Sequence, residues 1–337
     1  MILVTGGLGF IGAHTATALL EKDYEVLIVD DLSNSTMDVL AGIEKAAKKK
    51  PLFEELDLKD SAKVSQLFKN HHIDGIIHFA AFKAVGESVE KPLEYYENNT
   101  VPLINLLLEI KKSRRNFPFI FSSSCTVYGE ANTLPITEEE AIKPAQSPYG
   151  NTKQIGEEIL VDATKALNNL QAISLRYFNP IGAHPSNEIG ELPLGKPQNL
   201  VPFITQTAAG LHDQLIVFGD DYPTPDGTCI RDYIHVVDLA NAHITALQRL
   251  TRHLSTEKYE VFNLGTGAGS SVLEVINSFE RVSNQKLSYS IGPRRSGDVV
   301  AAYADTQKAK NVLGWKADQT LDQAIASAWA WEQKIRS

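Results

Sequence analysis

The sequence is poor in cysteine and has no long apolar run, and each absence excludes a class of protein. Cys125 and Cys229 are the two cysteines among 337 residues, and they lie too far apart in the chain to suggest a zinc site or a disulfide framework. We therefore expect two buried thiols in a reducing, cytoplasmic environment. No basic stretch leads into an apolar one near the N-terminus, and no apolar run reaches about 18 residues, so we expect neither a signal peptide nor a membrane span.

Positive charge and metal-ligand motifs are also scarce. Lysine and arginine number 32 against 41 acidic residues, and the resulting net charge of -9 disfavours nucleic acid or an anionic membrane as a partner. The nine histidines form no His-Glu-x-x-His motif, so we expect no metal site. The remaining composition, 43% hydrophobic and 22% charged, is that of a globular protein long enough for one large α/β unit or two lobes.

Short apolar runs alternate with longer amphipathic stretches in the first half of the chain. Brief runs bounded by charged or turn residues are typical of strands buried on both faces, and they occur at 2–4, 26–29, 76–79, 119–121 and 173–175. Helix-length segments separate them, at 11–22, 36–49, 61–70, 93–113 and 149–167. Repeated strand–helix units predict an α/β fold with a parallel sheet, right-handed crossovers and helices on its faces.

The local composition of the sequence changes after Arg176, where prolines and glycines become frequent. Ordered segments are still expected at 201–209 and 215–218, which suggests a second, smaller α/β lobe. We place the division between residues 1–177 and 178–337. A strand near 260–265 is expected to return to the main sheet, and 321–335 has the pattern of an amphipathic helix.

A glycine-rich turn follows the first expected strand and opens the first expected helix. Gly6, Gly9 and Gly12 permit a tight turn, close backbone approach to a pyrophosphate and tight helix–strand packing, while Phe10 and Ile11 begin the helix. Because a strand precedes this turn, a helix follows it and an acidic residue lies further on, the pattern predicts a Rossmann-type dinucleotide site.

The acidic residue is Asp30, 18 positions after Gly12 and at the end of the second expected strand. A carboxylate there accepts hydrogen bonds from ribose hydroxyls and repels a 2′-phosphate, so the sequence predicts NAD rather than NADP. No basic residue follows it within the adjoining cofactor-binding segment, which consists of Asp31, Leu32, Ser33, Asn34 and Ser35.

The ends of the next three strands also carry residues suited to a ligand site. Asp57 and Leu58 follow the third strand, where an aspartate can reach an adenine amino group. Small residues and a lysine close the fourth strand, namely Phe79, Ala80, Ala81, Phe82 and Lys83. Ser122, Ser123 and Ser124 close the fifth strand at the carboxyl edge of the sheet, where ligands bind in open α/β folds. For Ser122 and Ser123, the alternative to a role at the ligand site is that their hydroxyls cap a turn.

Tyr149 and Lys153 lie four residues apart near the start of an expected helix and so share one face of it. A phenol titrates near ~10, and lowering that pKa to about 7 takes roughly 4 kcal/mol. One cation ~5 Å away supplies roughly 3 kcal/mol at an effective dielectric constant of ~20, so Lys153 and a second positive charge together suffice. The pair is therefore a candidate base with Ser124 as its partner, or alternatively an ordinary surface pair.

Almost end to end, the sequence resembles the extended short-chain dehydrogenase/reductase family and, within it, the UDP-glucose 4-epimerases. The glycine turn and the Tyr149/Lys153 pair resemble the wider family. More specific similarity lies in the stretches His78 to Ser88, Ser122 to Gly129, Leu175 to His184, Gly219 to His235 and Arg294-Arg295-Ser296-Gly297-Asp298.

The resemblance implies a mechanism. In it, Tyr149 as phenolate takes the proton of a sugar 4-hydroxyl while hydride passes to NAD, and the 4-keto sugar turns before the hydride returns. Lys153 and the nicotinamide charge lower the pKa of Tyr149, Ser124 helps to relay the proton, and uridine diphosphate anchors the substrate. The second lobe is then the substrate-binding lobe, and the protein is expected to be a homodimer built from the helices at 93–113 and 149–167.

The resemblance also assigns residues to both ligands. Lys83, Asn98, Ser124, Tyr149, Lys153 and Phe178 map onto cofactor-contacting positions. Lys83, Ser124, Tyr149, Asn179, Asn199, Leu200, Ile216, Val217, Phe218, Arg231, Arg295, Asp298 and Ala302 map onto the nucleotide-sugar site. Arginine suits the diphosphate because its planar fork donates bidentately. Arg294 is left open between a surface turn and a role in binding.

Ala302 departs from the family pattern, because strict glucose/galactose members have a bulky tyrosine there. A small residue leaves room for a 2-acetamido group, so UDP-GlcNAc and UDP-GalNAc become candidate substrates. Cys125, beside Ser124, is read as a small filler, and Asp31 still disfavours NADP where some relatives have asparagine.

Three alternatives remain. A nucleotide-sugar 4,6-dehydratase needs an acid pair just after Ser124, whereas this chain has Cys125-Thr126. An epimerase of UDP-linked uronic acids or pentoses differs only by small pocket changes. A non-catalytic NAD-sensing protein would typically lack Tyr149 or Lys153.

Overall fold

A computed structural model describes residues 1–295 and 298–337. Ser296 and Gly297, which belong to the arginine-containing stretch singled out above, lie outside the described residues. Within the described ranges, no helix has the length and apolar character needed to cross a membrane.

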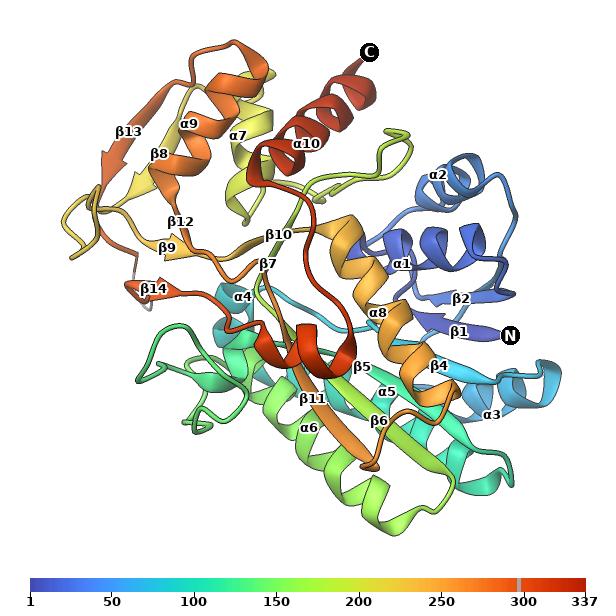
Figure 1. Cartoon of the computed structure of the whole chain (residues 1–337). Coiled ribbons are helices and arrows are strands. Elements are labelled where there is room, and N and C mark those ends of the chain that lie inside the picture. Colours follow the sequence, from blue (N-terminus) through green and yellow to red (C-terminus); the bar gives the residue numbers. More distant parts are fainter. Residues whose placement is uncertain (296–297) are drawn as a thin grey trace.

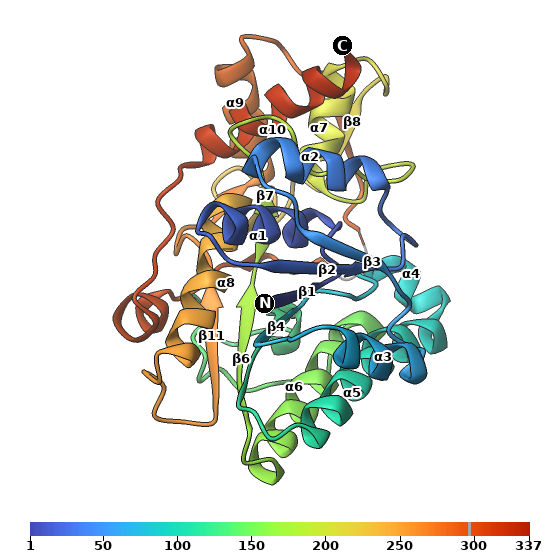
Figure 2. The same cartoon turned by 90° about the vertical axis from the view of Figure 1, so that its right-hand side faces the viewer.

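A seven-stranded parallel sheet forms the centre of the molecule (Figures 1 and 2). In order across the sheet, its strands are β11 (Tyr259–Leu264), β6 (Leu170–Tyr177), β5 (Phe117–Ser124), β4 (Gly75–His78), β1 (Ile2–Thr5), β2 (Val26–Asp30) and β3 (Leu52–Glu55). The expected α/β fold with a parallel sheet is confirmed, and the strand expected to return near 260–265 is β11, which pairs with β6 along its whole length.

Helices cover both faces of the sheet (Figure 2). One face carries α1 (Phe10–Glu21), α2 (Met37–Ala47) and α8 (Val236–Thr251), and the other carries α3 (Ser61–Asn70), α5 (Pro92–Lys112) and α6 (Pro148–Ala166). Successive strand residues supply the two faces in turn: Ile2 and Val4 belong to the cluster under α1 and α8, and Leu3 belongs to the cluster under α3 and α5. Both faces are apolar because both are buried.

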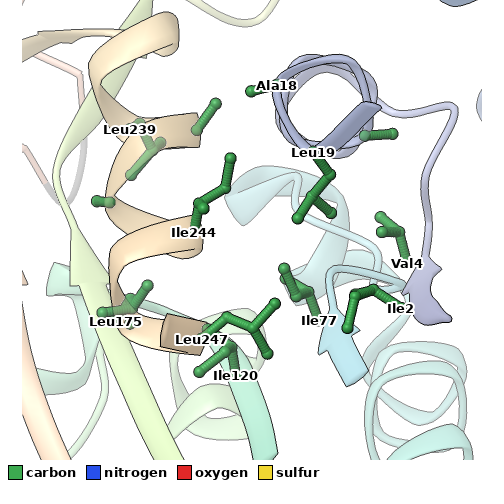
Figure 3. Packing of buried hydrophobic residues seen from close by; sticks show 14 of the residues in the cluster. Ile2, Val4, Ala18, Leu19, Ile77, Ile120, Leu175, Leu239, Ile244 and Leu247 are labelled. Atoms are coloured by element: carbon green, nitrogen blue, oxygen red, sulfur yellow. The ribbon is translucent and has the colours of Figure 1, made fainter. Parts of the chain in front are cut away.

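Helix α8 is an element of the main sheet's cover that the sequence did not predict. Leu239, Ile244 and Leu247 of α8 pack beside Ala18 and Leu19 of α1 and over the strands (Figure 3). The short π-helical turn η2 (Ala309–Leu313) joins the same apolar cluster. The sequence had assigned both segments to the second lobe, but they complete the core of the first.

A second cluster of helices lies on one side of the sheet, in the upper left of Figure 1. It consists of α7 (Leu200–Ala208), α9 (Val272–Ser283), α10 (Leu321–Arg336) and the parallel pair β8 (Leu215–Phe218) with β13 (Tyr289–Gly292), and it has its own apolar core. The connecting elements are β7 (Asn179–Ile181), β9 (Ile230–Arg231), β10 (Tyr233–His235), β12 (Ser270–Ser271), β14 (Ala301–Ala302), α4 (Val85–Glu90) and the 3-10 turn η1 (Cys125–Tyr128). We retain the two-lobe division as a proposal, with the first lobe extended to include α8, β11 and η2.

Four buried histidines make folding stability sensitive to acid. Burial lowers the pKa of His14 and His78 to about 3 and that of His235 and His243 to about 4. Because the unfolded chain binds these protons from about pH 6.5 downward and the folded chain does not, stability is present above that pH and is lost below it.

We therefore expect the melting temperature to fall steadily from about pH 6.5 to pH 4.5. His243→Met, which removes one buried imidazole, should make this fall shallower, and His72→Gln serves as the exposed control. Calorimetry across this pH range measures both. A melting temperature that stays constant over the range would contradict the expectation.

Candidate active site

The glycine turn between β1 and α1 is held in shape by close backbone approach. Gly6 has φ of +64°, and a Cβ atom there would lie 2.6 Å from the Ala80 nitrogen. A Cβ atom on Gly12 would overlap the Gly6 carbonyl oxygen and lie 2.9 Å from the Gly7 Cα. A Cβ atom on Gly9 would meet only the Gly6 oxygen, at 3.3 Å, so Gly9 faces open space beside the first turn of α1. This open cradle at a helix N-terminus fits the pyrophosphate of a dinucleotide.

Asp30 ties the glycine turn to the segment that follows β2. One of its carboxylate oxygens accepts from the Leu8 backbone N–H at 3.0 Å, and the other accepts from the Leu32 N–H at 3.1 Å and the Ser35 hydroxyl at 2.7 Å. Asp31 accepts from the N–H and the hydroxyl of Ser33. The predicted acidic residue therefore lies directly beside the predicted turn, with Leu32 to Ser35 folded around it.

The segments after β3 and β4 lie at the same edge of the sheet. Asp57 accepts from the Lys59 N–H at 2.9 Å. The Phe82 N–H donates to Asn99 Oδ1 at 2.8 Å, and Asn99 Nδ2 donates to Thr152 Oγ1 on α6 at 2.9 Å. Asn99 thus fixes the loop that contains Phe79 to Lys83 against the helix of the Tyr149/Lys153 pair. Sequence reasoning selected its neighbour Asn98 and missed Asn99, because the partners that distinguish Asn99 come close to it only in the folded chain.

Local sequence sets the start of α6. The Ser147 hydroxyl accepts from the Gly150 N–H at 3.1 Å, and Pro148 occupies the first helical turn, so the helix begins immediately before Tyr149. Lys153 is buried, and its Nζ donates to the Ser122 carbonyl oxygen at 2.7 Å and lies 5.9 Å from the centre of the Tyr149 ring. The predicted common face of Tyr149 and Lys153 is confirmed, and the alternative of a surface pair is wrong.

Ser124 ends β5 beside Tyr149. Its hydroxyl accepts from the Thr126 N–H at 3.2 Å, and its proximity to Tyr149 favours the ionised phenol and so lowers the pKa of Tyr149. Ser122 and Ser123 do not cap a turn, because they lie inside β5, where Ser122 is hydrogen-bonded to Tyr177 and Ser123 donates to Glu157. The sequence expectation of turn capping was therefore wrong for these two residues.

Burial changes the proton affinities of the pair in opposite directions. It raises the pKa of Tyr149 to about 12, against the effect of Ser124, and lowers the pKa of Lys153 to about 8, against the effect of the Glu157 carboxylate. The sequence-based estimate began from an ordinary phenol and omitted this desolvation. A base at position 149 therefore needs more positive charge from its surroundings than that estimate required.

Residues of the second lobe gather opposite this edge. Arg231 and Arg295 both pair with Asp298, at 3.4 and 3.2 Å, and the Arg295 guanidinium lies 5.6 Å from the centre of the Phe218 ring. Ile216 and Phe218 are exposed on β8, whereas Val217 points into the core of the lobe, so its side chain is not available to a ligand. Alternation along a strand accounts for this difference from the sequence-based assignment.

Arg294 pairs with Asp221 at 2.7 Å and lies 4.1 Å from the centre of the Tyr222 ring. Both partners are supplied by the adjoining loop, which favours a surface role over a role in binding.

Two candidate residues from different lobes meet at Glu191. Lys83 Nζ lies 3.4 Å from a Glu191 carboxylate oxygen, and Asn199 Nδ2 donates to the same oxygen at 2.6 Å. Sequence reasoning did not select Glu191, because nothing in its local sequence distinguishes it from an exposed loop acid. Asn179 follows β6 and begins β7, and Leu200 begins α7 at the border of the second core.

Ala302 lies on β14 and pairs in register with Arg231 on β9. It packs at the edge of a small apolar cluster that contains Val127 and Phe178. Val127 belongs to η1, the turn that Ser124 caps. Ala302 thus lies between the Ser124 turn and the arginine cluster.

Among residues 1–295 and 298–337, no group of three or more histidine, cysteine, aspartate or glutamate side chains could hold a metal ion.

Similarity to known proteins extends over nearly the whole chain. A family model described as GDP-mannose 4,6 dehydratase matches residues 3–328. A UDP-glucose 4-epimerase of Schizosaccharomyces pombe is 49% identical over 337 residues, covering 99% of this chain and 94% of that protein.

Two crystal structures of UDP-glucose 4-epimerases are also similar. The one from Bifidobacterium longum, in complex with NAD+ and UDP, has 46% identity and a TM-score of 0.94 over 99% of this chain and 98% of that one. The one from Stenotrophomonas maltophila, with bound NAD and formylated UDP-arabinopyranose, has 43% identity and a TM-score of 0.95 over the same shares. With this identity over its full length and with Ser124, Tyr149 and Lys153 at the carboxyl edge of the sheet, the chain belongs to the UDP-glucose 4-epimerase family.

Proposed function

We propose that the protein is an NAD-dependent enzyme that reversibly inverts carbon 4 of UDP-glucose and UDP-galactose. The observation that carries the proposal is that Ser124, with Tyr149 and Lys153 next to it, ends a strand at the same edge of the parallel sheet as the open cradle of Gly6, Gly9 and Gly12. A base at that point can take a proton from a sugar hydroxyl whose carbon faces a dinucleotide. The similar structures contain NAD with UDP or a UDP-sugar, which supports the same pair of ligands here.

The residues that would hold NAD form a continuous edge. The turn from Gly6 to Gly12 suits the pyrophosphate, and Asp30 and Asp31 suit the adenosine ribose and disfavour a 2′-phosphate. Asp57, Phe79 to Lys83, Asn98 and Phe178 complete this proposed site. When bound, the nicotinamide supplies a reversible hydride acceptor for carbon 4 and a positive charge next to the phenol.

Residues of the chain itself accept and return the proton of the sugar 4-hydroxyl. Tyr149 takes the proton from the sugar 4-oxygen and returns it after the sugar has presented its other face, and Ser124 hydrogen-bonds the same oxygen. Lys153, fixed on the Ser122 carbonyl with its Nζ 5.9 Å from the centre of the Tyr149 ring, places a positive charge near the phenol that favours its ionised form. The raised pKa of Tyr149 means that Lys153 does not suffice alone, so proton transfer should depend on a bound, oxidised cofactor.

The nucleotide part of the substrate would remain anchored while the sugar turns. Arg231 and Arg295 offer forked donors to the diphosphate, and Phe218 with Ile216 offers an apolar surface to the base. Asp298 orients both arginines. Remote binding of this kind holds the molecule without fixing the reacting ring.

Direct assay of several UDP-sugars tests the proposal. UDP-galactose should convert to UDP-glucose without added reductant, and the equilibrium mixture should be identified by NMR of the sugar protons. UDP-GalNAc, UDP-xylose and UDP-glucuronate are the comparison substrates. Turnover of a uronate or a pentose with no turnover of UDP-galactose would replace the proposed substrate, and loss of oxygen from carbon 6 would indicate a dehydratase.

Elimination is disfavoured by the residues beside Ser124. Cys125 and Thr126 occupy the positions where a 4,6-dehydratase needs an acid pair. The buried Glu157 is held by Arg176 and Ser123 and is not free to serve instead. The chain therefore matches the GDP-mannose 4,6 dehydratase model without having the residues that the elimination reaction needs.

We also propose that the pocket accepts N-acetylated sugars, because Ala302 is small and lies between the Ser124 turn and Arg231. Ala302→Tyr should lower kcat/KM for UDP-GalNAc by roughly 100-fold, about 2.8 kcal/mol, while changing that for UDP-galactose by less than about threefold. Parallel initial-rate assays measure the ratio. Ala302→Ser is the matched control, because it keeps a small side chain. Equal losses for the two sugars, or no turnover of UDP-GalNAc by the unaltered protein, would argue against the proposal.

A cytoplasmic homodimer is the proposed form of the enzyme. Both cysteines are free, which fits a reducing compartment. Leu93, Ile104 and Leu108 are exposed on one side of α5, next to α6, and would be covered by the same helices of a second copy.

A further inference from the structure

Behind the proposed base lies a buried ion pair that the mechanism above does not use. Glu157 follows Lys153 by one helical turn on α6, and Arg176 extends from β6 to meet it. Arg176 Nε lies 2.9 Å from Glu157 Oε1, its Nη2 lies 2.5 Å from Oε2, and both side chains are almost fully buried. A bidentate contact of this kind fixes both groups in orientation.

The pair is connected to the strand that ends in Ser124. The Ser123 hydroxyl donates to Glu157 Oε1 at 2.5 Å, and Arg176 Nη1 donates to the Tyr128 hydroxyl at 3.0 Å. Tyr128 in turn donates to Asn263 on β11 at 2.7 Å. Three adjacent strands and α6 are therefore joined behind the site.

We propose that Glu157 and Arg176 are positioning residues for Tyr149 and Lys153. In this proposal, Glu157 keeps the buried Lys153 protonated, and Arg176 cancels the negative charge that would otherwise oppose the Tyr149 phenolate. The inference rests on the proposed epimerase function, because it concerns the same base.

The charges around Lys153 support this arrangement. Burial lowers the pKa of Lys153 to about 8, and Glu157 is the group that raises it. Without Arg176, the charges of Lys153 and Glu157 would cancel, and little positive potential would remain at Tyr149. With Arg176, the cluster of Lys153, Glu157 and Arg176 carries one net positive charge.

Other titratable groups that pack around the cluster stay neutral in the working range. Burial raises the pKa of Cys125 to about 11 and that of Tyr128 to about 12, raises those of Tyr95, Tyr177 and Tyr259 further, and lowers that of His78 to about 3. The charged groups further out are Glu87 and Lys91, which pair on α4, the exposed Glu158, and Glu138, which accepts from the Asn263 N–H. The pH dependence of the site should therefore reflect the four residues Tyr149, Lys153, Glu157 and Arg176.

Three variants of the holoenzyme separate charge from structure. Glu157→Gln keeps an acceptor for Ser123 and removes a negative charge, so the pKa values of Tyr149 and Lys153 should both fall. The whole pH profile of kcat/KM should then move toward acid by about one pH unit, the lower end of the effect of a single nearby charge. Arg176→Met should move it toward alkali. The double variant Glu157→Gln/Arg176→Met restores the net charge and should return the profile to within about 0.3 pH units of the unaltered enzyme.

A second readout does not need turnover. The near-ultraviolet absorbance of the Tyr149 phenolate, identified by its loss in Tyr149→Phe, should titrate with the same displacements in each variant. Absence of epimerase activity in the unaltered enzyme with these displacements present would refute the proposed function and leave the charge arrangement supported.

Arg176→Met leaves a buried carboxylate without its partner, so the single variant is the one that can fail to fold. In that event, Glu157→Gln and the double variant decide the matter. An unshifted profile in Glu157→Gln, or an equal shift in the double variant, would overturn the proposal. Lowered kcat/KM in every variant with an unshifted pH profile would show that the pair only supports the fold and would overturn the proposal.

Discussion

Replacing Tyr149 by phenylalanine should lower kcat for UDP-galactose by about 10³-fold, within the usual contribution of a positioned general base. The substitution removes one hydroxyl from a side chain whose ring already lies beside Lys153, so packing is retained. Ser124 cannot replace the missing base, because an alcohol holds its proton far more tightly than a phenol does. Bound NAD and the melting temperature should remain as in the unaltered protein. Stopped-time assays with NMR detection, together with the cofactor content of the purified protein, measure these quantities.

Tyr96 offers a matched control for this result. Tyr96 lies on α5, and its hydroxyl accepts from Asn151 Nδ2 at 2.8 Å. Asn151 is on α6, the helix of Tyr149, but within the described part of the chain the Tyr96 hydroxyl has no hydrogen bond with Ser124. Tyr96→Phe should therefore change kcat by less than about threefold, since it removes one part-buried hydrogen bond of about 1 kcal/mol. Turnover that survives in Tyr149→Phe, or that falls equally in Tyr96→Phe, would show that position 149 is not the base.

The second large effect concerns Gly12. A Cβ atom at this position overlaps the Gly6 carbonyl oxygen and approaches the Gly7 Cα, and neither backbone atom can move without opening the turn. Gly12→Ala should therefore lower the free energy of unfolding by about 3 kcal/mol. It should also weaken NAD binding by roughly 100-fold, since the turn carries the proposed pyrophosphate site. Denaturant titration and calorimetric titration with NAD measure the two effects.

Substitutions at two other glycines distinguish an effect on folding from an effect on NAD binding. A methyl group at Gly9 meets only the Gly6 oxygen and points into the cradle, so Gly9→Ala should weaken NAD binding and lower stability by no more than about 1 kcal/mol. At Gly86 on α4 a methyl group meets nothing, and Gly86→Ala should leave NAD binding unchanged. If Gly12→Ala binds NAD as tightly as Gly86→Ala does, the turn is not the cofactor site.

Local pattern was enough to predict much of the first lobe. The strands of the sheet are short and largely apolar because helices cover both faces, and each of the five expected runs coincides with a strand, although the run at 76–79 extends one residue past β4. Helix α8 was missed because its position in the fold depends on a partner more than 200 residues earlier, α1, and no local signal announces that contact. The prolines before it suggested a different lobe; Pro180 lies in β7 and Pro202 in the first turn of α7, and the others lie in connecting loops.

The residues of the candidate site likewise fall into two groups, those that local sequence reveals and those that only the folded structure reveals. Residues with a characteristic spacing, such as Gly6 to Gly12 and Tyr149 with Lys153, could be found in the sequence. Asn99, Glu191 and the Glu157–Arg176 pair could not, because each acts through a partner brought near only by folding. Sequence reasoning also omitted desolvation, which depends on burial and therefore on the complete fold.

The pairing of β11 with β6 has a consequence for synthesis on the ribosome. A nascent chain released as far as Tyr177 has made six strands of the sheet, but β6 is still an unpaired edge and the face meant for α8 is bare. The face can be covered once Thr251 has left the exit tunnel, and the edge stays open until Leu264 has followed. During that interval the half-made protein presents an open edge and apolar surface, the features that promote association between chains. Chaperone attachment should therefore be strongest on chains stalled between these two points and should decline once β11 is in place.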